Sequence, residues 1–175
     1  SKFTFNLSAS FQKFDSMYFF TPDNISSYGN KFQMTYDNLS QTSFMGEITY
    51  QDSEKLKVSA KGEYFIYDPS NELYAWQKPE FLITLSGLLD LSNKIIVNSD
   101  IYLVGQRKVF SHYEPLRDYE LEDVKYVSSL KPLIDMNLSA EYRYNKKVSG
   151  FIQFNNFIGK KYQYWSNFPV QSIYI

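Results

Sequence analysis

Residues 2–12 read KFTFNLSASFQ, and apolar and polar side chains alternate along the whole stretch. The apolar members are Phe3, Phe5, Leu7, Ala9 and Phe11, and every residue between them is polar. Successive side chains of a β-strand point to opposite faces of the sheet. The stretch therefore predicts a strand with one apolar and one polar face.

The same period of two returns along the chain, at 31–37, 44–51, 56–66, 81–90, 95–103, 134–144 and 148–155. Several of these segments span about ten to twelve residues, whereas about five or six is typical of strands in soluble proteins. We therefore predict an all-β fold, a large antiparallel up-and-down sheet in which about nine or ten strands can be recognised.

The connections between these segments are sorted by length. Short turns at 52–55, 92–94 and 145–147 alternate with long connections at 68–79, 106–133 and 158–169. Outer-membrane barrels have short turns at the periplasmic end and long loops outside, whereas a soluble sandwich has no reason to sort its loops by end. The pattern favours a transmembrane β-barrel, in which the long connection 106–133 is the best candidate for external contacts.

Composition narrows the function classes. The chain has 175 residues, of which 19% are aromatic, a net charge of −1 and no cysteine. Such aromatic enrichment is typical of a barrel with aromatic girdles. No cluster of Lys and Arg alternates with aromatic residues, so the sequence indicates no binding of nucleic acid. The absence of cysteine excludes a disulfide framework, a thiolate metal site and a Cys nucleophile within these residues.

Two sets of candidate site residues follow from the alternation. The polar set is expected to line a lumen and consists of Lys57, Lys61, Glu63, Asp100, Asp135, Glu141 and Arg143. The second set is expected to face lipid or to form girdles at the headgroup level, and it consists of Phe3, Phe5, Phe11, Tyr64, Ile66, Leu138, Tyr142, Tyr144 and Trp165. Charged side chains in a narrow lumen pair with one another, so the polar set is interpreted as lining rather than as a substrate site.

Catalytic chemistry is not indicated. His112 is the only histidine, and it stands in a long connection without a nucleophile motif around it. The acidic run of Glu114, Asp118, Glu120, Glu122 and Asp123 in the same connection does not have EF-hand spacing and is interpreted as a solvated loop. We expect no enzyme activity, no cofactor and no metal site.

The last third of the chain resembles a known family. The residues that carry the resemblance are Leu130, Asp135 to Asn137, Glu141 to Tyr144, Asn155 to Phe157, Lys161, Tyr162, Trp165 and Pro169 to Gln171, with Ala75 to Pro79 and Gly105 to Arg107 upstream. This run resembles the closing hairpins of TonB-dependent-receptor-like outer-membrane barrels of the Bacteroidetes type, and the resemblance covers residues from about 45 to 171.

The resemblance implies a non-enzymatic barrel in the bacterial outer membrane that takes up a nutrient too large for porins. Its partners would be outer-membrane lipid and lipopolysaccharide, together with missing barrel strands or other outer-membrane proteins. Such receptors have a plug domain and a segment that TonB contacts, and neither is seen in residues 1–175. The expected organisation is therefore a single β-barrel domain or the C-terminal segment of a larger barrel.

Two alternatives remain open at the level of the sequence. A barrel without a plug could be an accessory or structural subunit of an outer-membrane assembly or secretion complex. A soluble ligand-binding β-barrel would instead bury the apolar faces in its own core and leave the polar faces in water.

Overall fold

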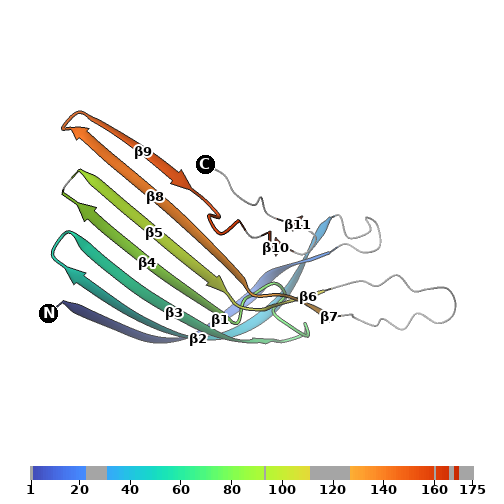
Figure 1. Ribbon diagram of the computed structural model, residues 1–175. Helices are drawn as coiled ribbons and strands as arrows, with labels where there is room; N and C mark the ends of the chain where they lie inside the picture. The colour runs from blue at the N-terminus through green and yellow to red at the C-terminus, as the bar shows by residue number, and fades with distance from the viewer. Residues whose placement is uncertain are drawn as a thin grey trace.

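The computed structural model describes residues 2–22, 31–92, 94–110, 127–159, 161–165 and 168–169. Seven strands form one large sheet: β1 (Phe3–Pro22), β2 (Phe32–Asp52), β3 (Leu56–Pro69), β4 (Phe81–Leu91), β5 (Ile95–Val104), β8 (Leu133–Asn145) and β9 (Val148–Phe154) (Figure 1). Their order in the sheet is their order in the chain, and every neighbouring pair is antiparallel. The described part of the chain contains no helix. The expected all-β, up-and-down fold is confirmed.

Two small sheets lie at the long-loop end of the large sheet. The strand β6 (Arg107–Phe110) pairs with β7 (Val127–Leu130), and β10 (Gln163–Trp165) pairs with β11 (Phe168–Pro169). The long connection 106–133 thus begins and ends as a hairpin stem that the alternation pattern did not indicate. His112 and the acidic run from Glu114 to Asp123 lie outside the described residues.

The strand β2 is longer than the sequence pattern indicates. It runs without a break through both of the alternating segments at 31–37 and 44–51. The residues between them read NLSQTS and carry little apolar alternation, but this stretch pairs with β1 on one side and, from Leu39 onward, with β3 on the other. Backbone hydrogen bonds to the neighbouring strands keep this stretch extended, although its side chains do not show the alternation that would predict a strand.

The strands are staggered as in the wall of a barrel. The register aligns Val58 of β3 with Phe154 of β9, through Gly87, Ser99 and Leu138. Val58 lies two positions after the first residue of β3, and Phe154 lies six positions after the first residue of β9. Between β3 and β9, which are four strands apart in the sheet, the end that carries the short turns is therefore displaced by four residues along the strands. A displacement of one residue per strand is about 3.3 Å along the strand for each strand spacing of about 4.8 Å. It corresponds to a strand tilt of about 35°. That tilt is the one a closed barrel requires.

A bulge in β1 separates the broad sheet from a two-stranded extension. The register shifts between Phe14 and Met17, and Ser16 within the bulge has a φ of 58°. The Ser16 amide donates to the Asn38 side-chain oxygen at 3.1 Å. Beyond this point residues 17–22 and 32–37 have no strand partner but each other among the described residues, and we call them the ribbon (Figure 1).

Most of the sheet is open to its surroundings on both faces, and the buried cluster sits at the base of the ribbon. Phe19 and Leu39 meet Ala75 and Trp76 from the connection between β3 and β4, and each of these side chains is buried. Phe14, Met17, Tyr67 and Phe110 pack around them. The bulge allows this cluster, because the extra residue places Met17 and Phe19 on the same side of the strand as Phe14.

Candidate functional site

The register places most of the apolar side chains of the seven strands on one continuous surface, which we call the apolar face. Phe5 and Leu7 of β1 are 68% and 87% exposed, and the surface continues through Ile48, Ala60 and Leu85. Monomeric soluble proteins rarely leave so broad an apolar surface open. The face has the chemistry of a lipid contact.

The residues expected to face lipid occupy this surface, with one exception in position. Phe3, Phe5, Phe11, Tyr64, Ile66, Tyr142 and Tyr144 are all exposed on the apolar face, and Leu138 is half-buried there. Trp165 lies away from it, on β10, where its ring packs against Phe20 at 5.6 Å and Phe32 at 6.1 Å between centroids. That the apolar face contacts lipid stays a prediction.

The opposite surface, the polar face, carries all of the residues expected to line a lumen, and most of them have partners. Lys61 pairs with Glu63 at 3.1 Å and Arg143 with Glu141 at 2.9 Å. The remaining hydrogen bonds join Asp100 to the Ser86 hydroxyl at 2.6 Å and Asp135 to the Tyr162 hydroxyl at 2.8 Å, while Lys57 is exposed near the turn. These contacts spread along the sheet, and the structure does not gather the seven residues into one cluster.

A buried carboxylate anchors the connection between β3 and β4 to the ribbon. Asp37 is 4% exposed, and its two carboxylate oxygens accept hydrogen bonds from the Asn71 and Glu72 backbone amides, each at 2.8 Å, and from the Asn71 side chain at 2.7 Å. The Asn38 amide donates to it as well, at 2.8 Å. Burial by itself raises the pKa of Asp37, but these hydrogen bonds outweigh burial and the pKa lies below its ordinary value.

Residues 70–80, which we call the inner loop, therefore fold over the polar face. The Trp76 indole donates to the Glu72 carboxylate at 2.8 Å, and its ring is 2% exposed. Gln77 follows with a φ of 61°, an uncommon conformation for a residue other than glycine. Its backbone amide donates to the Lys108 carbonyl at 2.7 Å and its side-chain amide to the Phe20 carbonyl at 2.8 Å. The inner loop is thus tied to β1, β2 and β6.

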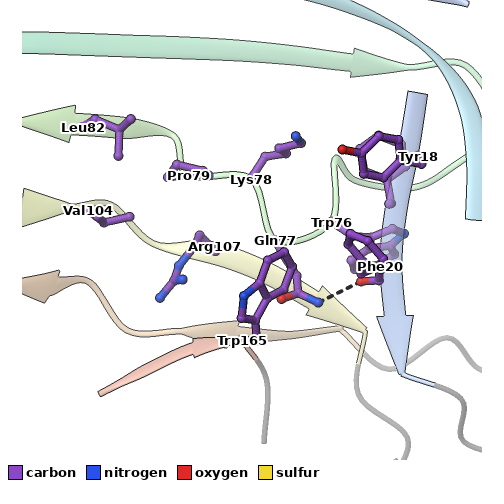
Figure 2. Close-up of a pocket in the computed structure, with 11 residues that line it drawn as sticks. Tyr18, Phe20, Trp76, Gln77, Lys78, Pro79, Leu82, Val104, Arg107 and Trp165 are labelled. Atoms are coloured by element: carbon purple, nitrogen blue, oxygen red, sulfur yellow. Dashed lines mark hydrogen bonds between the residues drawn. The ribbon is translucent and has the colours of Figure 1, made fainter. Parts of the chain in front are cut away.

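A pocket of about 400 Å³ lies between the inner loop, the ribbon and β10, and we call it the loop-end pocket (Figure 2). Tyr18 and Phe20 of β1 line it together with Trp165 of β10. Lys78 of the inner loop and Arg107 of β6 bring two positive charges to its lining. Burial lowers the pKa of Lys78, and the Arg107 guanidinium donates to the Gln163 carbonyl at 2.9 Å.

A second pocket of about 530 Å³ lies at the far edge of the sheet, beyond the end of β9. Lys131, Lys161 and Tyr162 line it, with Leu133 and Ile134 of β8. We call it the edge pocket. Its lysines are exposed, and Tyr162 is held by the hydrogen bond to Asp135.

The alternation pattern indicates neither the Asp37 anchor nor the loop-end pocket. Four lining residues carry part of the family resemblance, which implies no site for them: Trp76, Gln77, Lys78 and Arg107. The available signal at Asp37 is the Asp-Asn doublet at 37–38, where alternation in β2 stops. Asp and Asn at such a break commonly bond to neighbouring backbone amides.

Among the residues that the structure describes, no group of three or more His, Asp or Glu side chains is placed to hold a metal ion. Within the same residues, no helix is long and apolar enough to cross a membrane.

Comparison with solved structures identifies the fold. The pyoverdine outer-membrane receptor FpvA from Pseudomonas aeruginosa, bound to pyoverdine, matches 98% of this chain and 25% of its own length, with 14% identity and a TM-score of 0.66. The siderophore receptor PiuA from Acinetobacter baumannii matches 97% of this chain and 24% of its own, with 16% identity and a TM-score of 0.59. A ferripyoverdine-bound receptor of the outer membrane of Pseudomonas aeruginosa matches 92% and 22%, at 14% identity and 0.64.

The sheet is thus similar to the wall of outer-membrane β-barrel receptors, and the chain spans about a quarter of the length of these receptors. No family model matches the sequence. No curated protein matches it either. The likeness at this level of identity establishes the fold, which is the TonB-dependent-receptor-like fold expected from the sequence.

Proposed function

We propose that the chain is part of the wall of an outer-membrane receptor that takes up a nutrient with energy from TonB. In this proposal residues 1–175 are the C-terminal part of a larger barrel, of the Bacteroidetes type that their sequence resembles. The apolar face contacts lipid and lipopolysaccharide, and the polar face lines the lumen. The protein is a transporter and performs no chemistry on its cargo.

The two-faced, staggered sheet is the observation that carries the proposal. An apolar surface that continues across seven strands is stable against hydrocarbon and costly in water, at about 25 cal/mol per Å² of apolar area. The tilt of about 35° fits closure of such a sheet into a barrel. Solved pyoverdine receptors with the same fold are outer-membrane proteins.

The outer edge of β1 supports the larger barrel. In the described part of the chain β1 pairs only with β2, so one edge of a strand of 20 residues has no ladder partner there. An unpaired backbone group in hydrocarbon costs several kcal/mol, and a spanning sheet must therefore close. Further strands are expected to pair with β1 in the membrane.

Cysteine labelling of intact cells tests the topology. Residues 1–175 contain no cysteine, so each variant adds a single labelling site to this part of the barrel, and the parent protein gives the background labelling. Tyr36→Cys on the ribbon, where Tyr36 is 59% exposed, should react with a membrane-impermeant maleimide in whole cells. Ser53→Cys in the turn between β2 and β3 should react only after the outer membrane is opened. Equal labelling of both sites in whole cells, or recovery of the protein in buffer without detergent, would contradict the proposal.

Uptake is tested by comparing two deletion strains. A strain without this protein and a strain without TonB should lose uptake of the same nutrient. A deletion phenotype in outer-membrane assembly or secretion that does not depend on TonB would instead identify an accessory barrel subunit.

A further inference from the structure

A groove lies in the apolar face over two paired glycines. Gly46 of β2 and Gly62 of β3 are direct partners in the register, so two neighbouring strands carry no side chain at this point. Leu7 of β1 stands opposite Gly46, and Ile83 of β4 stands opposite Gly62, so these two side chains flank the pair. The hollow has a volume of about 360 Å³, and we call it the glycine groove.

The fold of the wall does not require glycine at either position. A Cβ atom at Gly62 would have no heavy atom within 4 Å, and one at Gly46 would meet only the Cδ2 atom of Leu7, at 3.4 Å. Among the described glycines only Gly159 has a positive φ, so the backbone at Gly46 and Gly62 admits a larger residue. Glycine inside a strand weakens it and commonly marks the close approach of a ligand or of another backbone. Apart from Leu7, nothing in the described part of the chain makes that approach.

The lining of the groove is apolar. Its rim toward the long loops is a row of three rings, because Phe44, Tyr64 and Phe81 are partners across β2, β3 and β4. Glu63 is the only acidic residue in the lining, and its side chain lies on the polar face in an ion pair with Lys61. The floor is backbone that already belongs to the ladder between β2 and β3. A hydrocarbon chain, which needs no hydrogen-bond partner, suits such a surface.

The depth of the groove fits one leaflet of the membrane. On β3 the apolar face runs from Leu56 to Ile66, and Asp68 follows it. Ten positions of about 3.3 Å at a tilt of about 35° give an apolar band about 27 Å tall, close to the height of about 25 Å in outer-membrane barrels. Gly62 lies on the long-loop side of the middle of this band. Tyr64 lies nearer the edge, where a tyrosine ring suits the headgroup level.

We propose that the glycine groove seats one acyl chain of lipid A, the membrane-embedded part of lipopolysaccharide. The chain enters from the leaflet at the long-loop end, passes the ring of Tyr64 and fills the space between Leu7 and Ile83. Left unfilled, the groove would deprive its lining atoms of dispersion contacts. The inference rests on the proposed function, which places the apolar face in lipid and the long loops outside. It adds one fixed lipid site to that face.

Native mass spectrometry of the protein extracted from outer membranes in mild detergent tests the site, because lipid A and phospholipid differ in mass. We expect lipid A on the parent protein and a lipid A-bound fraction at least threefold smaller for Gly62→Leu, which fills the groove without a clash at its Cβ. Gly87→Leu is the matched control. Gly87 lies on the same face outside the groove, and nothing lies within 4 Å of a Cβ there, so this variant should retain as much lipid A as the parent.

A milder variant keeps the test decisive if Gly62→Leu does not assemble. Gly62→Ala adds one methyl group to the floor of the groove and should give an intermediate lipid A-bound fraction. An unchanged fraction in the assembled Gly62 variants would overturn the inference. Equal losses in Gly62→Leu and Gly87→Leu would overturn it as well, because any larger residue on the apolar face would then act alike.

The same spectra distinguish the other possible occupants. If Gly62→Leu loses a bound phospholipid and keeps its lipid A, the groove holds the wrong lipid for the inference to stand. If Gly62→Leu loses a dimer and keeps its lipid A, the groove is a contact between two copies of the chain and the inference is wrong.

The outcome is separable from the proposed function. Cysteine labelling and TonB-dependent uptake involve neither glycine of the groove. Correct labelling together with an unchanged lipid A-bound fraction in Gly62→Leu rejects the lipid site alone. Loss of lipid A in Gly62→Leu, in a protein whose deletion phenotype does not depend on TonB, rejects the uptake role alone.

Discussion

The carboxylate of Asp37 accepts hydrogen bonds from both the backbone amide and the side-chain amide of Asn71, 34 residues further along the chain, at 2.8 and 2.7 Å. This pair, with the Glu72 amide, holds the inner loop over the polar face. The loop in turn supplies Trp76, Gln77 and Lys78 to the loop-end pocket. One buried acid on the ribbon therefore sets the geometry of a site whose lining comes from six separate elements or loops.

Replacement of Asp37 by Asn should release the inner loop. The substitution removes the negative charge that accepts four hydrogen bonds and places an amide where an acceptor is needed, and we expect a loss of about 2–4 kcal/mol in the local stability of the loop. Limited proteolysis of the folded protein should show faster cleavage within residues 70–80. Asp52→Asn is the matched control, because Asp52 forms an exposed ion pair with Lys2, and it should leave the cleavage rate within residues 70–80 unchanged. Equal protection in Asp37→Asn and the parent would contradict the anchoring role.

The same anchor should depend on pH in one direction. The pKa of Asp37 in the folded protein lies below its ordinary value of 3.8, so the folded state binds this proton less readily than the unfolded chain does. Its stabilising contribution is therefore complete above pH 3.8 and is lost as the pH falls through the lower, folded value. Pepsin cleavage of the inner loop, followed from pH 5 downward, should accelerate in the parent protein. In Asp37→Asn cleavage should be fast throughout, and a parallel acid response in both proteins would assign the effect to other groups.

Two neighbouring residues test which face meets lipid. Leu138 and Ser139 lie side by side in the middle of β8, on the apolar and the polar face. A nitroxide on Leu138→Cys should be accessible to oxygen, which concentrates in hydrocarbon, and inaccessible to a water-soluble nickel chelate. The nitroxide on Ser139→Cys should show the reverse preference. Protection of the Leu138 label from both reagents would mean that the apolar face is covered by protein, as in a soluble barrel.

The sequence was sufficient for the large sheet because one rule, alternation with period two, operates along at least part of each of its seven strands. The rule does not describe the ends of the strands. At Phe14 the bulge at Ser16 reverses the parity, so that Met17 and Phe19 turn inward. Alternation alone assigns those residues to the wrong side. The position of the inner loop could not be predicted from alternation either, because it depends on hydrogen bonds to Asp37. This residue is distant in sequence and has the type of an ordinary turn residue.

A close contact at Gly105 offers a test of packing where the large sheet gives way to β6. A Cβ atom at Gly105 would lie 2.8 Å from Cδ1 and 2.9 Å from Cε1 of the Phe81 ring, and 3.1 Å from its backbone nitrogen. Since the backbone cannot yield as a flexible side chain does, Gly105→Ala should destabilise the protein by about 1–3 kcal/mol. Gly87→Ala is the control, because nothing lies within 4 Å of a Cβ there, and it should be neutral. Urea unfolding in lipid vesicles measures both, and Phe81→Leu should restore part of the loss if the ring is the obstacle. Equal stability of the two alanine variants would show that β4 and Gly105 are further apart in the membrane.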